Sequence, residues 1–250
     1  IYEERIVAFL DILGFSSLVE KSADDIVKQI ELYDFLKKYS KHEHAREVFS
    51  GFRRGDGNIC AYEDIEGLRK VYDYQFTQFS DYFVFSVKAE DRASVQFFPI
   101  LVGQFMLQAL ELGFLVRGGI AKGPMVHEEI GPVFGPAFIQ AYLIESGQAV
   151  FGRTVLSKEA FDFISKSGQF SSDWIERGFD DEWEITIASY IKQIFSSSLG
   201  EAQRVPSLKD ALQRIEQILG KLKPSEQDRV GGKYRYVICR LHHAIEEASN

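Results

Sequence analysis

Two aspartates interrupt stretches of sequence that are otherwise apolar. Asp11 lies within the apolar run Ile6–Leu13, and Asp81 lies between Phe79 and the run Tyr82–Phe85. A carboxylate buried in a strand costs several kcal/mol unless it is ion-paired or binds a cation. If the two strands are neighbours, the carboxylates converge, and a divalent cation between them relieves their repulsion. The two aspartates therefore predict a metal site for phosphoryl or nucleotidyl transfer. The alternative is that each aspartate pairs with an arginine or caps a turn.

The elements that would position these aspartates alternate between strands and helices. Residues 5–14 predict a strand buried on both faces, and Ser16 with Ser17 predicts the cap of a helix that runs to Tyr39. The polar stretch 41–57 predicts a loop, 69–87 two strands, and 92–112 a helix. We then expect strands at 114–121 and 125–133 around a Gly123–Pro124 turn, a helix at 137–146, a strand at 150–156, and helices at 207–222 and 234–247. The pattern predicts an α/β fold with a core domain at 1–166 and a mostly helical C-terminal extension at 167–250, packed on the core.

Composition and charge exclude several classes of protein. The chain has 250 residues, 45% of them hydrophobic, which is enough for a sizeable core. Its 29 Lys and Arg against 37 Asp and Glu give a net charge of -8, which disfavours nucleic acid as a partner. The apolar stretches fall short of the roughly 18 residues that span a bilayer, so we expect no membrane partner. Cys60 and Cys239 are the only cysteines, as is typical of a cytoplasmic protein, and a first residue other than Met leaves room for residues before Ile1.

Four segments, in order, resemble the motifs of the class III nucleotide cyclases. Phe9–Ser16 is similar to the family strand F-x-D-I-x-G-F, and Phe79–Ser86 to the G-D-x-F hairpin. Val116–Val126 is similar to V-R-x-G-I-x-x-G, and Phe134–Glu145 to the helix G-x-x-V-N-x-A-x-R-L-E. The resemblance covers residues from about 6 to 157. It implies an α+β ferredoxin-like core with a central, mostly antiparallel sheet flanked by helices.

The same resemblance implies a metal-dependent nucleotide cyclase and a set of site residues. Asp11 and Asp81 would bind two divalent ions, Mn²⁺ or Mg²⁺, with the Ile12 carbonyl as a further ligand. In the implied reaction, the ribose 3′-hydroxyl attacks the α-phosphorus and pyrophosphate leaves. Backbone amides at a helix start would cradle the triphosphate; they belong to Leu13, Gly14, Phe15 and Ser16.

Several positions depart from the family pattern. The base-reading positions of purine cyclases fall on Thr77 and Pro132, which cannot make the charged contacts that select adenine or guanine. The Asn and Arg that stabilise the transition state fall on Ile139 and Leu143, and loss of one such donor costs about 10²- to 10³-fold in rate. The glycine that usually precedes the second aspartate is Ser80. The candidates for contacts to phosphate or base, or for the missing roles, are Arg117, Lys122, Gln140 and Tyr142.

Three stretches resemble the bacterial pyrimidine cyclases of the Pycsar anti-phage systems more than they resemble purine cyclases: Phe79–Asp81, Val116–Gly123 and Phe151–Ser157. This resemblance implies conversion of UTP, or alternatively CTP, to the 3′,5′-cyclic monophosphate after phage infection, with a separate effector that binds the product. It also implies a homodimer with sites at the interface.

Two rival functions stay open beside pyrimidine cyclisation. An adenylate or guanylate cyclase is disfavoured by Thr77 and Pro132. A catalytically silent cyclase-like domain would bind nucleotide as a regulatory module. The lost Asn and Arg positions favour this second rival, whereas the retention of both Asp11 and Asp81 opposes it.

Overall fold

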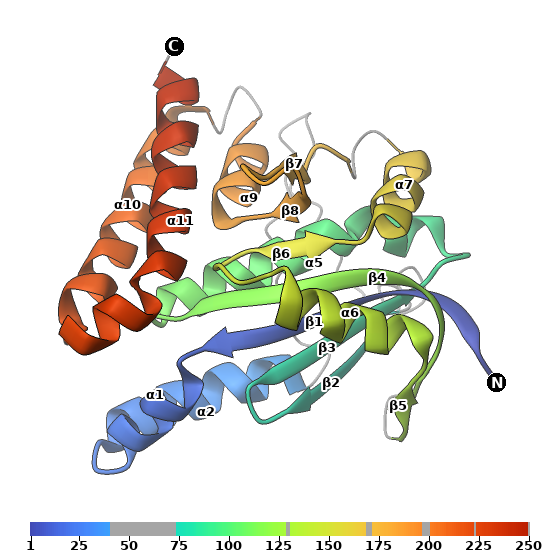
Figure 1. Ribbon diagram of the computed structural model, residues 1–250, viewed down its shortest axis with the longest axis horizontal. Helices are drawn as coiled ribbons and strands as arrows, with labels where there is room; N and C mark the ends of the chain where they lie inside the picture. Colours follow the sequence, from blue (N-terminus) through green and yellow to red (C-terminus); the bar gives the residue numbers. More distant parts are fainter. Residues whose placement is uncertain (41–73, 129–130, 169–171, 197–200, 223, 250) are drawn as a thin grey trace, which may run out of the picture.

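The computed structural model describes residues 1–40, 74–128, 131–168, 172–196, 201–222 and 224–249, so the loop predicted at 41–57 lies outside the described residues. Within them, eight strands form one sheet with helices on both faces (Figure 1). The strands are β1 (Glu3–Leu13), β2 (Tyr74–Phe79), β3 (Tyr82–Lys88), β4 (Leu115–His127), β5 (Val133–Phe134), β6 (Thr154–Leu156), β7 (Glu176–Arg177) and β8 (Trp183–Ile185). The helices are α1 (Phe15–Ser22), α2 (Ile26–Ser40), α5 (Arg92–Glu111), α6 (Pro136–Gly147), α7 (Lys158–Ser167), α9 (Ile187–Ile194), α10 (Glu201–Lys221) and α11 (Pro224–Ser249).

The first four strands form a ferredoxin-like core. They lie in the order β2-β3-β1-β4, and each neighbouring pair is antiparallel. The described elements follow the βαββαβ sequence of that fold. The sheet continues through β6, which is parallel to β4, and then through β8 and β7, which are antiparallel. The predicted α/β fold, with a central and mostly antiparallel sheet flanked by helices, is confirmed.

The central strand β1 contributes to two hydrophobic cores, because successive side chains of a strand point to opposite faces. Residues such as Ile6 and Leu10 join the larger core with α5. Val7 and Phe9 join a smaller core with α6. Asp11 continues this second alternation and is therefore directed to the α6 face of the sheet.

Helix α5 is the central helix of the larger core. Asp91 caps its first turn by accepting hydrogen bonds from the amides of Ala93 at 3.1 Å and Ser94 at 3.2 Å. Pro99 lies inside the helix without ending it. The expectation that every apolar stretch is too short to span a bilayer is wrong for α5, the one helix of the described residues that is long and apolar enough. Because 67% of that apolar window is buried against the rest of the chain, the burial in the core accounts for its composition.

Two local predictions were wrong. The helix expected from Ser16 to Tyr39 is divided into α1 and α2, and Gly14 rather than a serine is the N-cap of α1. No turn occurs at Gly123–Pro124, where β4 continues as a strand paired with Arg5 and Glu4 of β1. Backbone pairing along the whole of β1 overrides the local preference of Gly and Pro for a turn.

Residues beyond 166 contribute to the sheet as well as to the helical part of the molecule. Strand β8 pairs with β6, and β7 pairs with β8, so the sheet crosses the predicted boundary. Helices α10 and α11 pack against each other at one side of the molecule, and α9 contacts both of them (Figure 1). The division at residue 166 stays a prediction, and the 167–250 extension is continuous with the core sheet.

Candidate active site

The two aspartates meet at one end of the sheet. Asp11 is near the end of β1, and Asp81 lies in the turn between β2 and β3. The Ile12 amide donates a hydrogen bond to the Asp81 carbonyl at 3.2 Å, which ties the turn to β1. Ser80, in the same turn, has a φ of 58°, a left-handed backbone conformation that glycine adopts more readily than serine. This backbone conformation explains why the cyclase motif has a glycine at the position of Ser80.

Arg117 joins the cluster from the other side of β1. It lies opposite Asp11 on β4, and its Nε donates to Asp11 Oδ2 at 2.9 Å. Its Nη2 reaches Glu145 Oε1 of α6 at 2.7 Å. One guanidinium thus bridges two carboxylates from two different elements.

Glu145 is a site residue that the sequence analysis did not single out. Its side chain is 2% exposed. It reaches Arg117 because α6 lies very close to β4 at Gly119, where any side chain would collide with the Ala141 carbonyl and the Glu145 amide. The signal that could have found it is the final glutamate of the α6 motif.

Positive charge is scarce in this cluster. Burial raises the pKa of the Asp11 carboxyl in spite of the hydrogen bond from Arg117, and the nearby Asp81 charge raises that pKa further. Burial also raises the pKa of Glu145 to about 7, against the opposing effect of Arg117. A further cation at this position would favour the charged form of both carboxyls.

The donor set at the aspartates fits a divalent ion of the hard, oxygen-binding type. Carboxylate and carbonyl oxygens are the ligands that Mg²⁺ and Mn²⁺ prefer, with waters and substrate phosphates completing the coordination. Here the donors would be Asp11, Asp81 and the Ile12 carbonyl. The described residues hold no group of three or more His, Cys, Asp or Glu side chains arranged for a metal. The fit therefore depends on the two carboxylates and on ligands from the substrate.

The segment after Asp11 forms a helix start that suits an anion. Gly14 has a φ of +81°, which an L side chain rarely adopts, and α1 begins immediately after it. No side chain caps this N-terminus, and no acidic residue occupies the first turn. Phe15 is buried in the larger core and anchors the turn. The amides of residues 13–16 thus lie beside Asp11, as the cradle prediction requires.

Thr77 lies on the same face of the sheet, in a buried polar relay. Its Oγ1 is 3.0 Å from Nε2 of His127, whose Nδ1 is 2.8 Å from the Ser86 hydroxyl. Arg5 Nε donates to that hydroxyl at 2.9 Å. Burial lowers the pKa of His127 to about 3, so the imidazole is neutral. The sequence analysis did not assign His127 to the site. It reaches Thr77 because β4 continues to residue 127.

Three other predicted residues are not brought to Asp11 within this chain. Lys122 lies opposite Ile6, five positions along β1 from Asp11 and roughly 17 Å away at the rise of a strand. Its ammonium pairs with Glu4 at 2.8 Å. Pro132 is exposed in the connection between β4 and β5. Gln140 lies five residues before Glu145 on α6, about 140° around the helix.

The surface beside the cluster is apolar. The exposed fractions on α6 are 57% for Ile139, 46% for Tyr142 and 59% for Leu143, and Phe79 in the neighbouring β2 is 78% exposed. Tyr142 packs edge-on against Phe9, with ring centroids 5.4 Å apart. The positions of the family's Asn and Arg are therefore part of an exposed apolar patch.

No protein-family model and no curated protein matches the chain. Among solved structures, the guanylyl cyclase domain of the RhoGC fusion protein from the aquatic fungus Blastocladiella emersonii is 15% identical and has a TM-score of 0.41, covering 73% of this chain and 94% of its own. The catalytic core of a rhodopsin-guanylyl cyclase with converted specificity, in complex with ATPαS, is 13% identical with a TM-score of 0.40, covering 74% and 96%. A bacterial light-regulated adenylyl cyclase is 16% identical with a TM-score of 0.41, covering 82% and 99%. At these values the likeness adds no argument for an activity.

Proposed function

We propose that this protein is a metal-dependent nucleotide cyclase that converts UTP to 3′,5′-cyclic UMP and pyrophosphate, with CTP as the near alternative. The observation that carries the proposal is the junction of Asp11 and Asp81, joined through the Ile12 amide and followed directly by the uncapped start of α1. Carboxylates for metal ions next to amides for a triphosphate are what a cyclase needs.

The residues of the chain have separate tasks in this reaction. Divalent ions bound at Asp11 and Asp81 would supply Lewis-acid activation of the ribose 3′-hydroxyl and neutralise charge on the pyrophosphate. The amides of residues 13–16 hold the triphosphate, and Arg117 holds the Asp11 carboxylate in place. The 3′-oxygen forms a bond to the α-phosphorus, the bond from that phosphorus to the bridging oxygen breaks, and the hydroxyl proton passes to solvent.

The neutral relay at Thr77 supports a pyrimidine rather than a purine substrate. Thr77 and the neutral His127 offer hydroxyl and imidazole hydrogen bonds, and neither carries the charge with which purine cyclases select their base. The role in anti-phage defence and the separate effector are proposed from the sequence resemblance alone, and the cytoplasmic location is proposed from the presence of only two cysteines. The exposed patch of Phe79, Ile139, Tyr142 and Leu143 supports a homodimer in which a second copy covers the site.

A silent nucleotide-binding domain is the second candidate, and one observation favours it. Ile139 and Leu143 are apolar and more than half exposed where a cyclase has polar transition-state residues. A regulatory module would keep nucleotide binding without turnover.

The test is to incubate the purified protein with Mn²⁺ and each of the four ribonucleoside triphosphates, and to measure pyrophosphate and cyclic product. We expect cyclic UMP or cyclic CMP. A cyclic purine product would contradict the pyrimidine assignment, and nucleotide binding without any product would leave the regulatory candidate.

Two variants test the metal site. Asp11→Asn and Asp81→Asn should both abolish turnover. Neither variant should be less stable than the wild type, because Asp81→Asn removes a charge that repels Asp11, and burial raises the pKa of Asp11 in spite of its ion pair with Arg117. Urea denaturation should place both variants at or above the wild type, and a marked loss of stability in either would favour a structural role for that aspartate. Equal turnover in the wild type and both variants would exclude the aspartates from catalysis.

A further inference from the structure

A relay of hydrogen bonds connects one side chain from each of the first four strands. Arg5 Nε donates to the Ser86 hydroxyl at 2.9 Å, and that hydroxyl lies 2.8 Å from Nδ1 of His127. Nε2 of His127 lies 3.0 Å from Thr77 Oγ1. Arg5, Ser86 and His127 are buried, whereas Thr77 is half-buried. The relay therefore runs from the protein interior to a partly exposed residue.

The directions of these hydrogen bonds follow from which groups can donate and which can accept. A guanidinium has no acceptor, so the Ser86 oxygen accepts from Arg5. The buried Ser86 hydroxyl also needs an acceptor for its own proton, and among the described residues the acceptor that it contacts is Nδ1 of His127. Burial lowers the pKa of His127 to about 3, so the imidazole carries a single proton, which this network assigns to Nε2. Nε2 therefore donates to Thr77 Oγ1.

Thr77 accepts at the end of the relay and keeps its own proton to donate. Within the described parts of the chain, the hydrogen bond with His127 is the one that the structure gives to Thr77 Oγ1. If the imidazole proton were on Nδ1 instead, the buried Ser86 proton would lose its acceptor, which costs free energy. The relay thus holds Thr77 as a donor toward an atom outside the relay. Such a donor suits a carbonyl oxygen and opposes an amino group.

We infer that His127 is a positioning residue that fixes Thr77 as the hydrogen-bond donor to the 4-carbonyl oxygen of uracil, so that the site takes UTP in preference to CTP. The inference rests on the proposed function, which brings a pyrimidine base to Thr77. Uracil and cytosine differ at position 4, where uracil has a carbonyl oxygen and cytosine an amino group. The amino group of cytosine would turn an N–H toward the Thr77 proton. The direction of one hydrogen bond therefore distinguishes the two pyrimidines.

The test compares the binding of two nucleotides that cannot cyclise. Isothermal titration in Mn²⁺ would measure the affinities of 3′-deoxy-UTP and 3′-deoxy-CTP. We expect the wild type to bind the uridine analogue about 10- to 100-fold more tightly, the range for a desolvated donor left without an acceptor. Thr77→Val keeps the shape of the side chain without its donor, and should reduce this preference to less than about 3-fold. Thr77→Ser keeps the hydroxyl and should retain the preference.

Substitutions of His127 test whether it acts through Thr77. His127→Leu leaves the Thr77 hydroxyl in place but free to donate or accept, so the preference for the uridine analogue should fall to less than about 3-fold. His127→Gln should restore it, because an amide can accept from Ser86 and donate to Thr77. Ser86→Ala is a smaller change that removes the group assigning the imidazole proton, and it should also lower the preference.

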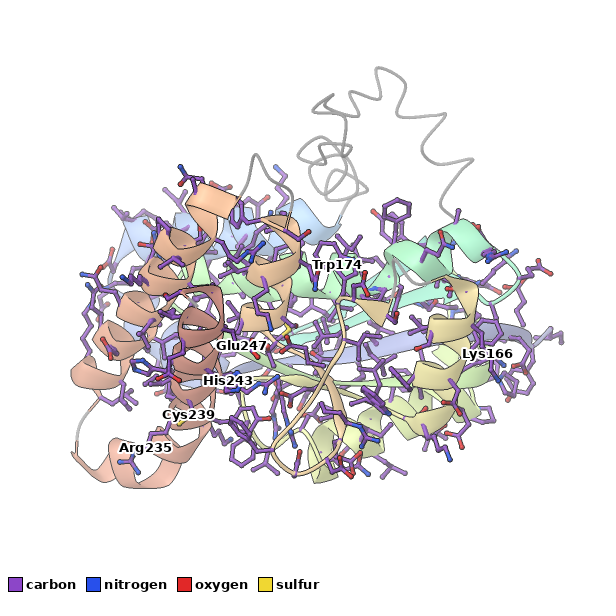
Figure 2. All side chains as sticks on the ribbon, turned by 90° about the horizontal axis from the view of Figure 1, so that it is seen from above. Lys166, Trp174, Arg235, Cys239, His243 and Glu247 are labelled. Carbon is purple, nitrogen blue, oxygen red and sulfur yellow. The ribbon has the colours of Figure 1, made fainter. Side chains whose placement is uncertain are left out.

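Two matched controls make the same chemical changes outside the relay. Thr154→Val removes a buried hydroxyl that lies 3.5 Å from the Met106 sulfur in the larger core. His243→Leu replaces a histidine whose side chain is 53% exposed, and Figure 2 shows it on α11 between Cys239 and Glu247. Both controls should keep the wild-type ratio of the two affinities.

The outcomes separate the inference from the proposed function. Equal binding of the two analogues by the wild type, or tighter binding of the cytidine analogue, would overturn the inference and leave the cyclase proposal intact. A wild-type ratio in Thr77→Val would do the same. Equal loss of both affinities in His127→Leu and Ser86→Ala, with the ratio unchanged, would assign His127 a packing role only. A wild type that binds neither analogue and forms no cyclic product would overturn both.

Discussion

Arg117 and Arg153 are each held between two carboxylates, and the clusters around them differ in their supply of positive charge. Arg117 bridges Asp11 and Glu145 at the edge of the candidate site, with 22% of its side chain exposed. Arg153, just before β6, bridges Asp180 and Glu184, with 1% of its side chain exposed. The deeper cluster has more donors: Glu184 also accepts from Tyr236 at 2.6 Å and pairs with Arg240 at 3.0 Å.

The carboxyls respond in opposite directions. The hydrogen bond from Arg153 lowers the pKa of Asp180, whereas burial raises the pKa of Asp11 and Glu145 beside Arg117. The Arg153 cluster is therefore closed, and it joins β6, β8 and α11 into one structure. The Arg117 cluster has fewer cations, and under the proposed function metal ions and substrate would complete it. We therefore expect Arg153 to be structural and Arg117 to belong to the proposed site, because the two arginines have different neighbours.

The largest stability loss should come from Arg153→Met. Glu184 has no exposed surface, so the variant leaves a buried carboxylate with fewer partners. Breaking a buried pair costs about 3–5 kcal/mol. Urea denaturation would measure this loss, and a loss below about 1 kcal/mol would show that Arg240 and Tyr236 suffice without Arg153.

A smaller stability loss and a larger loss of function should follow Arg117→Met. The cluster is partly solvated, so we expect about 1–3 kcal/mol, the cost of leaving charged hydrogen-bonding groups unpaired. Turnover should fall by about 10²-fold, because Asp11 loses the group that orients it. Denaturation and product formation would be measured on the same preparation. Full activity in Arg117→Met would place Arg117 with Arg153 as a structural residue.

The pH dependence of stability should distinguish Glu145 from an ordinary acid. Its folded pKa of about 7 lies above the usual 4.5, so the native protein holds a proton that the unfolded chain releases. The stabilisation from Glu145 is complete below pH 4.5 and is lost as the pH rises through 7. As the pH rises from 4.5 to 7, the wild type should therefore lose stability relative to Glu145→Gln. A difference that stays constant from pH 4 to 8 would contradict the raised pKa.

Arg177→Gln should have the smallest effect and provides the exposed reference for the comparison. Arg177 pairs with Asp181 at 3.0 Å, with side chains 49% and 88% exposed, and lies over the Trp183 ring. Exposed ion pairs and cation–π contacts contribute at most about 1 kcal/mol each. Denaturation should show a loss of that size, reduced at high salt. A loss equal to that of Arg153→Met would mean that burial does not determine how much stability is lost when Arg153, Arg117 or Arg177 is replaced.

Much of the candidate site was predictable from local pattern. The apolar runs around Asp11 and Asp81 predict two strands with a carboxylate at each, and Gly14 predicts the turn before α1. These features are local, because strand alternation and turn conformation depend on residues that are adjacent in sequence. The four ordered motifs also predicted the sheet, and the structure has that sheet.

The tertiary structure decided the contacts between segments that lie far apart in the chain. Glu145 reaches Arg117 only because α6 docks on Gly119, and His127 reaches Thr77 only because β4 continues past Gly123. The same register separates Lys122 from the aspartates. By itself the sequence determined which residues carry charge into a buried sheet. The pairing of β1 with β4 and the docking of α6 and α11 decided which charges meet, because register and helix docking depend on the whole core rather than on neighbouring residues.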